Sequence, residues 1–351
     1  MKKATYYKAS RRLGITLSTL LIIVSIAGEA QLADIVNSGS NNISDLNKSL
    51  ENDIKIQEKA IEINPQNSTA WSTKGLDLGL SGRYDEAIKT FNKTIEINPQ
   101  NSDVWTGEGL ALYYLNKYDE AISAYDKAIE INSQNSIAWD GKGLALYKLD
   151  KYDEAIKAFD KAIEINSQNL IAWEGKGLAL NNLNKHEEAI KAYDKAIEIN
   201  PHDSKAWSNK GRSLNKLNKY EEAMKAYDKA IEINPFDSIA WEGKGLALDN
   251  LNKHEEAIKA FDKAIEINPL DSITWASKGD ALNDLNKSDE AIKAFDKAIK
   301  INPLGSIAWE GKGLALENLN KRKEAIKAYD KAIEINPRYS MALEAKKKLD
   351  K

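Results

Sequence analysis

All eight tryptophans of this 351-residue chain are spaced 34 residues apart, without an insertion. They are Trp71, Trp105, Trp139, Trp173, Trp207, Trp241, Trp275 and Trp309. Each tryptophan is followed by glycine at the fourth position, leucine at the seventh, alanine at the sixteenth and an aromatic residue at the twentieth. A fixed period of this length predicts a stack of similar repeats, each too small to bury its apolar face alone. The sequence therefore predicts one array of repeats, although the length alone would suggest two or three globular domains.

Each repeat carries the pattern of a first helix that begins just before the tryptophan. Tryptophan, glycine and leucine at i, i+4 and i+7 share one face of that helix. A serine three residues before most tryptophans, as at Ser136, is the predicted N-cap, and Leu170 is the exception. The first helix is expected to end near a Leu-Asn-Lys sequence, because asparagine tolerates the left-handed conformation.

A second helix follows in each repeat and is expected to begin with acidic residues such as Asp119 and Glu120, which suit the positive end of a helix dipole. It is predicted to end at Glu-Ile-Asn-Pro or Glu-Ile-Asn-Ser, since proline cannot continue a helix. The recurring glycine and alanine let the two helices approach closely. Each tryptophan is expected to be buried against a neighbouring repeat, which would cover roughly 150–250 Å². The predicted fold class is all-α.

The period divides the chain into eight full repeats between two partial ones. Residues 50–67 match only a second helix, and residues 340–351 match only a first helix that caps the stack. The full repeats span residues 68–101, 102–135, 136–169, 170–203, 204–237, 238–271, 272–305 and 306–339. Repeats 170–203 and 238–271 are identical at 30 of 34 positions. Such similarity favours a repetitive scaffold over a site built from unique residues.

Residues 1–30 have the pattern of an export segment. Lys2, Lys3 and further basic residues precede an uncharged run from Leu13 to Gly28. As a helix this run would measure about 24 Å, short of the ~30 Å hydrocarbon core, so we favour a signal peptide over an N-terminal membrane anchor. A third alternative is a cytosolic protein with a fortuitous apolar start. The charge bias places the rest of the chain outside the cytoplasm in the first two cases. Residues 31–49 are predicted to be a polar linker.

Composition excludes several function classes. The 50 Lys+Arg and 53 Asp+Glu give a net charge of −3, which excludes a strongly basic nucleic-acid binder. The absence of cysteine excludes disulfides, thiolate-bound zinc and thiol catalysis. Recurring Gly-Lys-Gly tripeptides lie inside predicted helices and lack the Ser/Thr of a phosphate loop. His186 and His254 stand where four other repeats have tyrosine, and no histidine or carboxylate cluster repeats around them, which disfavours metal ligation and acid–base catalysis. We expect no catalytic centre, no cofactor and no metal site.

The repeat pattern resembles that of the tetratricopeptide repeat family, W-x2-L-G-x2-Y…A-x3-F…P. The residues that carry the resemblance in the third repeat are Trp139, Lys142, Gly143, Leu146, Ala155 and Phe159. Lysine replaces the family's leucine and leucine replaces its tyrosine, while size and spacing are kept. The resemblance covers about residues 50–351. It implies an α-solenoid, a right-handed superhelix of antiparallel helix pairs, whose first helices line a concave groove that binds peptides or partner proteins.

If that geometry holds, the residues two before, one after, five after and eight after each tryptophan line the groove. In three repeats these positions combine isoleucine and leucine with one acid directly after the tryptophan, namely Asp140, Glu174 or Glu242. Two interpretations stay open. Either the aliphatic side chains seal adjacent first helices while the acids face water, or this surface binds an extended or helical segment with basic side chains.

The repeat 204–237 departs from that pattern, because polar and basic residues take the same positions. They are Lys205, Ser208, Arg212 and Asn215, flanked by Asn209 and Lys216. One interpretation is ion pairing with the acids of adjacent repeats, worth about 0–1 kcal/mol each when exposed. The other is a site for a carboxylate or an acidic side chain. The family's carboxylate clamp is a poor match, because no repeat has lysine directly after its tryptophan.

Together these features predict a non-catalytic scaffold that binds a peptide or partner protein along the groove, outside the cytoplasm. The alternative is a structural spacer or a self-assembling component of the cell envelope. No nucleic-acid partner is expected. A membrane would be contacted only through the N-terminal segment, if that segment is not cleaved.

Overall fold

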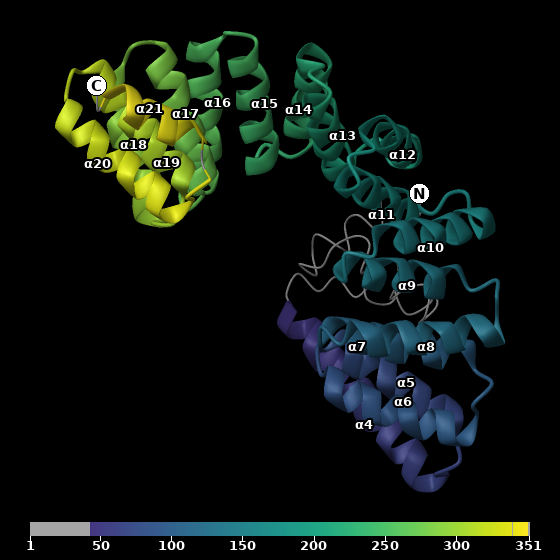
Figure 1. Ribbon diagram of the computed structural model, residues 1–351. Coiled ribbons are helices and arrows are strands. Elements are labelled where there is room, and N and C mark those ends of the chain that lie inside the picture. The colour runs from purple at the N-terminus through teal and green to yellow at the C-terminus, as the bar shows by residue number, and fades with distance from the viewer. Residues whose placement is uncertain (1–42, 339, 350–351) are drawn as a thin grey trace. The chain divides into compact units, whose positions relative to one another are not determined.

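The computed structural model describes residues 43–338 and 340–349, and these residues form helices α4 to α21 and no strand (Figure 1). The helices are α4 (Ile43–Ile63), α5 (Ser68–Leu80), α6 (Tyr84–Ile97), α7 (Ser102–Tyr114), α8 (Tyr118–Ile131), α9 (Ser136–Lys148), α10 (Tyr152–Ile165), α11 (Leu170–Asn182), α12 (His186–Ile199), α13 (Ser204–Lys216), α14 (Tyr220–Ile233), α15 (Ser238–Asn250), α16 (His254–Ile267), α17 (Ser272–Asp284), α18 (Ser288–Ile301), α19 (Ser306–Asn318), α20 (Arg322–Ile335) and α21 (Ser340–Leu349). The predicted all-α fold class is confirmed. None of these helices is both long enough and apolar enough to cross a membrane.

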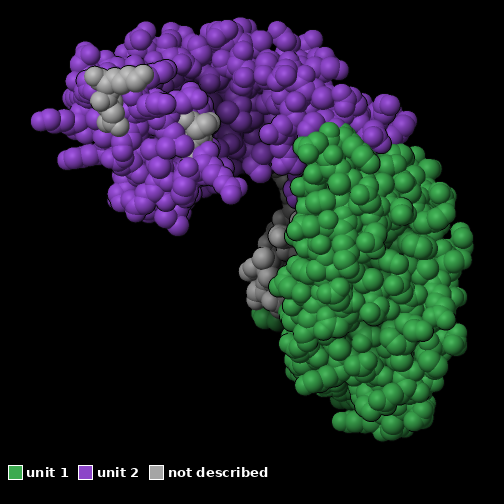
Figure 2. Space-filling view, viewed as in Figure 1, with its two compact units in different colours: residues 1–185 green, residues 186–351 purple. Residues whose placement is uncertain are grey.

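The chain divides into two compact units, residues 1–185 and 186–351 (Figure 2). The division falls between α11 and α12, the two helices of repeat 170–203. Within each unit, the two helices of a repeat pack antiparallel, and the second helix also packs against the first helix of the next repeat. First helices of successive repeats contact each other as well, as α13 contacts α15 and α17 contacts α19. This nearest-neighbour packing is that of an α-solenoid.

The first helices are capped one residue earlier than the sequence pattern predicts. The Asn135 side chain accepts a hydrogen bond from the Ala138 N–H, and Asp237 accepts from the N–H groups of Ile239 and Ala240. The predicted serine N-cap is therefore wrong, because the serine is already the first helical residue and the Asn or Asp before it has the non-helical backbone of a cap. Leu170 is then no exception, since Asn169 caps its helix.

The first helices end as predicted, with an Asn or Asp in the left-handed conformation. Asn116 has φ 60° and Asp150 has φ 58°, and the equivalent residue of the first repeat is Gly82, with φ 78°. After Asn116, the Lys117 N–H donates to the Leu112 carbonyl at 2.9 Å. This hydrogen bond closes the helix end and turns the chain into the second helix.

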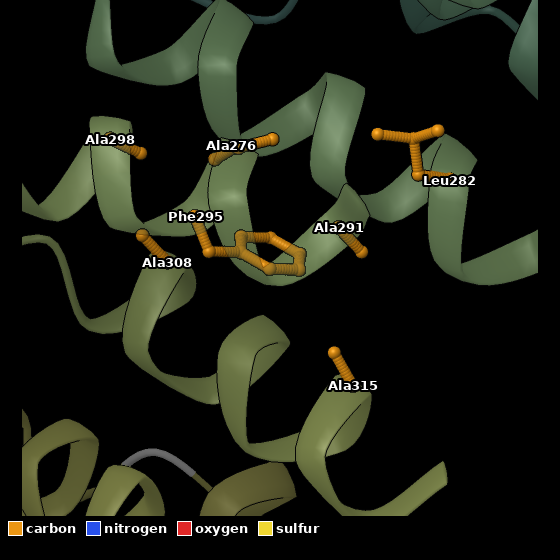
Figure 3. Close-up of a cluster of buried hydrophobic side chains, with 8 residues drawn as sticks. Ala276, Leu282, Ala291, Phe295, Ala298, Ala308 and Ala315 are labelled. Atoms are coloured by element: carbon orange, nitrogen blue, oxygen red, sulfur yellow. The ribbon is translucent and has the colours of Figure 1, made fainter. Parts of the chain in front are cut away.

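The aromatic residue of the second helix lies at the centre of the repeat core, and in five repeats it packs between a glycine of its own repeat and a glycine of the next. After Tyr193 and Phe261, the next repeat has Asn209 or Ser277 in place of the second glycine. The Phe159 ring lies against Gly143 of its own repeat and Gly175 of the next, and a Cβ atom at either glycine would collide with it. Equivalent sandwiches form around Phe91, Tyr125, Tyr227 and Phe295. Figure 3 shows the Phe295 ring among small residues of three consecutive helices, α17, α18 and α19. The first glycine of each Gly-Lys-Gly tripeptide is therefore a packing residue.

The tryptophans are half-buried, so the expectation that they form the shared buried core is wrong. Each indole N–H instead donates to a carbonyl in the loop before its helix, as Trp139 Nε1 does to the Ser133 carbonyl at 3.1 Å. The fully buried rings are those of Phe159 and its equivalents on the second helices. The tryptophan fixes the loop between repeats, while the second-helix aromatic residue fills the interior.

A lysine three residues after most tryptophans links each repeat to the preceding one. Lys142 Nζ on α9 lies 2.5 Å from Asp126 Oδ1 on α8 and 5.7 Å from the centre of the Trp139 ring. Where Glu108 replaces the lysine, Asn92 replaces the aspartate, which avoids a pair of like charges. The equivalent ion pair recurs through both units, between Lys176 and Asp160, Lys210 and Asp194, Lys244 and Asp228, Lys278 and Asp262, Lys312 and Asp296, and Lys346 and Asp330.

The N-terminal helix is longer than predicted, because α4 begins at Ile43 and not at residue 50. Residues 43–49 were expected to be linker from their Asn and Ser content, and this expectation is wrong. Ile43, Leu46, Leu50 and Ile54 follow a helical spacing, and Leu50 and Ile54 are buried in unit 1. The predicted signal peptide or anchor at residues 1–30 and the rest of the predicted linker lie outside the described residues.

One repeat has an acid inside its core. Asp77 is fully buried, and neither carboxylate oxygen has a hydrogen-bond partner among the described residues. Seven repeats place alanine or serine at this position: Ala111, Ala145, Ala179, Ser213, Ala247, Ala281 and Ala315. Burial, with a smaller effect of the nearby Asp53 charge, raises the Asp77 pKa to about 7. The first repeat therefore contains a destabilising group that the others lack.

Substituting alanine for Gly143 tests the glycine sandwich. The new Cβ would lie 2.6 Å from Phe159 Cε1, whereas Gly79 of α5 has no atom within 4 Å of that position. We expect Gly143→Ala to lower the free energy of unfolding by about 1–3 kcal/mol through overpacking, and Gly79→Ala to raise it by roughly 0.5–1 kcal/mol. Urea denaturation followed by circular dichroism measures both. Equal stability of the two variants would contradict the sandwich.

Removing the buried acid should stabilise the protein. An unfolded aspartate ionises near pH 4, while folded Asp77 holds its proton up to about pH 7. Between these values the folded state binds more protons, so the free energy of unfolding falls as the pH rises. We expect Asp77→Ala to raise that free energy by about 1–3 kcal/mol, with a larger gain at pH 8 than at pH 5. Urea midpoints of parent and variant at both pH values measure this, and a destabilised variant would contradict it.

Candidate functional site

The first helices of unit 2 carry a continuous surface with an unusual side-chain pattern. Helices α13, α15, α17 and α19 contact one another in chain order. On each, the residues two before, one after, five after and eight after the tryptophan share one side of the helix. We call this set the first-helix face: Lys205, Ser208, Arg212, Asn215, Ile239, Glu242, Leu246, Asp249, Ile273, Ala276, Asp280, Asn283, Ile307, Glu310, Leu314 and Glu317.

The face exposes large aliphatic side chains. Ile239, Ile273 and Ile307, which occupy one position on three successive helices, are 59%, 64% and 58% exposed, and Leu314 is 42% exposed. Isolated exposed aliphatic residues are ordinary, but a row of them on adjoining helices is a candidate interaction surface. In unit 1 the equivalent Ile137 is half-buried and the equivalent Ile171 is buried.

Acids lie among these aliphatic residues. Burial raises the pKa of Glu242 to about 7, and the nearby Asp271 charge adds to the shift. The Asp280 pKa is also raised to about 7, first by burial and then by the charges of Glu310 and two aspartates. Burial likewise raises the Glu310 pKa. Among the described residues, no basic side chain lowers the pKa of these three acids. A basic group placed here would therefore gain favourable charge interactions.

The end of the face at α13 is basic. Lys205, Arg212 and Lys216 are exposed, and Arg212 Nη2 donates to Asn209 Oδ1 at 2.9 Å. Asn215 acts differently, because its Nδ2 donates to the Gly243 carbonyl of the next first helix at 3.0 Å. Asn283 makes the same contact with the Gly311 carbonyl at 3.3 Å. Asn215 is thus a link between repeats more than a surface group.

The sequence-predicted binding residues are divided between the two units. Asp140 and Glu174 belong to unit 1, and the other six belong to unit 2. Asp140 is buried and its Oδ2 accepts a hydrogen bond from Asn169 Nδ2 at 2.6 Å, so it links α9 to the cap of α11. The alternative in which the Asp140 carboxylate faces water is therefore wrong, and partner binding by Asp140 stays a prediction. Glu174 is half-buried on α11.

Sequence reasoning missed two of the acids on the face. Asp280 takes a position that is leucine in most repeats, and Glu310 repeats the position of Glu242. Both acids lie at positions of the predicted groove, five residues after Trp275 and one residue after Trp309. The signal for them is therefore present in the sequence, at those positions of every repeat.

It also missed a histidine–carboxylate cluster. His254 Nδ1 lies 2.8 Å from Asp249 Oδ1 and 3.8 Å from Asp284 Oδ2. The sequence disfavours a metal site because no carboxylate cluster repeats around the histidines; such a cluster is present at His254, while the matching positions around His186 are Asn181 and Lys216.

Comparison with known proteins follows the same repeat boundaries. Sequence profiles described as tetratricopeptide repeat match residues 69–101, 102–135, 141–204, 204–237, 238–270, 260–293 and 277–340. The fold and these matches define an α-helical repeat protein. The chain belongs to the tetratricopeptide repeat family. A search of curated proteins found no match.

Solved structures show the same fold. The chain is similar to the structure titled "APC/C hetero-tetramer Cut9-Hcn1", with 18% identity and a TM-score of 0.60 over 95% of this chain and 63% of that one. It is also similar to a tetratricopeptide repeat protein from Parabacteroides merdae, with 17% identity and a TM-score of 0.58 over 71% of this chain and 99% of that one. A third similar structure is YrrB, titled a TPR protein with an unusual peptide-binding site, with 28% identity and a TM-score of 0.45 over 55% of this chain and 99% of that one.

Proposed function

We propose that this protein is a non-catalytic scaffold that binds a segment of a partner protein on the first-helix face of unit 2. The observation that carries the proposal is the row of exposed isoleucines on α15, α17 and α19 with half-buried acids between them. Burying that row against a partner would remove apolar surface from water, which stabilises association by roughly 25 cal/mol per Å² before ordering costs.

The charges of the face indicate the chemistry of the segment. Lys205, Arg212 and Lys216 make the α13 end basic, whereas Glu242, Asp280 and Glu310 make the α15–α19 part acidic. A segment with a carboxylate at one end, and with lysine or arginine beside apolar residues along the rest, would match both charge and polarity. In this proposal, Lys205 and Arg212 bind the carboxylate of the segment.

The proposed location is outside the cytoplasm. This part of the proposal rests on the basic and apolar pattern of residues 1–30. Protease protection of the full chain in intact cells tests it: cleavage of the repeats by an externally added protease supports an extracytoplasmic location, and complete protection contradicts it.

A structural role is the second candidate, because the same exposed isoleucines could be covered by another copy of the chain and because the repeats are so alike. Light scattering of the full chain separates the two candidates. A mass that rises with protein concentration favours self-assembly, and a constant monomeric mass favours capture of a partner.

The partner chemistry can be tested with two labelled peptides that differ only in charge, one alternating leucine with lysine and one alternating leucine with glutamate. By fluorescence anisotropy we expect only the lysine peptide to bind. The variant Glu242→Gln/Asp280→Asn/Glu310→Gln should weaken that binding about tenfold or more, which is about 1.4 kcal/mol. Binding should also weaken from pH 8 to pH 6, because Glu242 and Asp280, with pKa values of about 7, become protonated.

The matched control neutralises three exposed acids of the second helices, Glu221→Gln/Glu255→Gln/Glu290→Gln. It removes the same formal charge away from the face and should bind the lysine peptide like the parent. Equal loss of binding in both triple variants would mean that overall charge, and not the face, attracts the peptide.

A further inference from the structure

Three helices of unit 2 bring an imidazole and two carboxylates together where repeats 238–271 and 272–305 meet. Asp249 lies at the end of α15, His254 begins α16, and Asp284 ends α17. His254 Nδ1 is 2.8 Å from Asp249 Oδ1 and 3.8 Å from Asp284 Oδ2, and all three atoms lie within 4.8 Å of one another. The cluster therefore combines side chains from two repeats and from three helices.

The turn between α15 and α16 directs the histidine into this cluster. Asn252 has φ 58° and reverses the chain, so that the first residue of α16 faces the end of α15. In three other repeats a tyrosine begins the second helix and its hydroxyl donates to the residue at the turn: Tyr118 to Asn116, Tyr152 to Asp150, and Tyr220 to Asn218. The ring nitrogen of His254 instead contacts Asp249, five residues earlier in the chain.

Negative charge is concentrated around the imidazole. The Asp249 pKa is raised by burial, an effect that the hydrogen bond and charge of His254 oppose and that the Asp284 charge increases. Asp280, on the same helix as Asp284, interacts with Asp249, Asp284 and Glu310. A divalent cation held at this point would offset the mutual repulsion of these carboxylates.

We propose that Asp249, His254 and Asp284 bind one divalent first-row transition-metal ion. The ligands are His254 Nδ1 and one carboxylate oxygen each from Asp249 and Asp284, and water completes the coordination. One imidazole with two carboxylates is a donor set that suits such ions better than Mg²⁺ or Ca²⁺, which prefer oxygen ligands alone. Ligand bonds of about 2.0–2.2 Å require only a small closing movement of Asp284, whose side chain is 57% exposed. The ion would tie α15, α16 and α17 together.

The chain contains its own control for this site. Repeat 170–203 is identical to repeat 238–271 at 30 of 34 positions, and His186 occupies the position of His254. The residues five before and thirty after His186 are Asn181 and Lys216, where His254 has Asp249 and Asp284. The proposal therefore assigns an ion to His254 and none to His186.

The test is titration of the purified full chain with Co²⁺ and Zn²⁺ in excess Mg²⁺, by visible absorption for Co²⁺ and by calorimetry for Zn²⁺. We expect one ion per chain, displacement of Co²⁺ by Zn²⁺, and a higher thermal unfolding midpoint with Zn²⁺. His254→Gln and Asp284→Asn should each weaken binding about tenfold or more. Asp284 is exposed, so its variant should fold, and circular dichroism checks both variants.

The double variant His186→Gln/His202→Gln, which leaves His254 as the sole histidine, should bind Co²⁺ and Zn²⁺ like the parent. Absence of stoichiometric binding at micromolar Zn²⁺ would overturn the proposal. Binding that survives in folded His254→Gln and Asp284→Asn, or that is lost in the double histidine variant, would also overturn it, because the ion would then lie elsewhere. Peptide binding by the first-helix face is measured separately, so either proposal can fail alone.

Discussion

The structure depends on an aromatic ring that packs between two first helices at positions where glycine leaves the backbone without a side chain. Phe159 and four of its equivalents, Phe91, Tyr125, Tyr227 and Phe295, contact one glycine in their own repeat and one in the next, so a single side chain joins two repeats. Because a Cβ atom at either glycine would enter the ring's space, the contact fixes the distance between successive first helices. The ion pair between Lys176 and Asp160, beside Trp173, then links the same two repeats as Phe159 at the surface, where charge pairs contribute less.

A core built this way leaves the outward positions of the first helices free to vary. The same positions carry Lys205 and Arg212 on α13, Glu242 on α15 and Asp280 on α17, while every full repeat keeps the glycine four residues after the tryptophan and the aromatic residue of the second helix. Surface chemistry can therefore differ from one repeat to the next without altering the packing. The proposed partner surface and the proposed metal site both arise from such differences between otherwise similar repeats.

Some polar residues of the first helices maintain the stack and are not available to a ligand. Asp140 hydrogen-bonds Asn169, and Asn215 hydrogen-bonds the Gly243 carbonyl, so each links two repeats. Asp77 shows the opposite case, since it is buried without a hydrogen-bond partner among the described residues. A polar side chain at one of these positions is a candidate for binding a ligand only where it is not already hydrogen-bonded to the neighbouring repeat.

The sequence by itself determined the repeat length, the two helices of each repeat, the left-handed residue that ends the first helix, and the all-α fold. These features follow from periodicity and local backbone preferences. The tertiary structure decided that Phe159 and its equivalents, and not the tryptophans, are fully buried. It also decided that Asp140 is hydrogen-bonded to Asn169 and that His254 lies beside Asp249 and Asp284. His254 and Asp284 are thirty residues apart, and only the packing of one repeat on the next sets the distance between them.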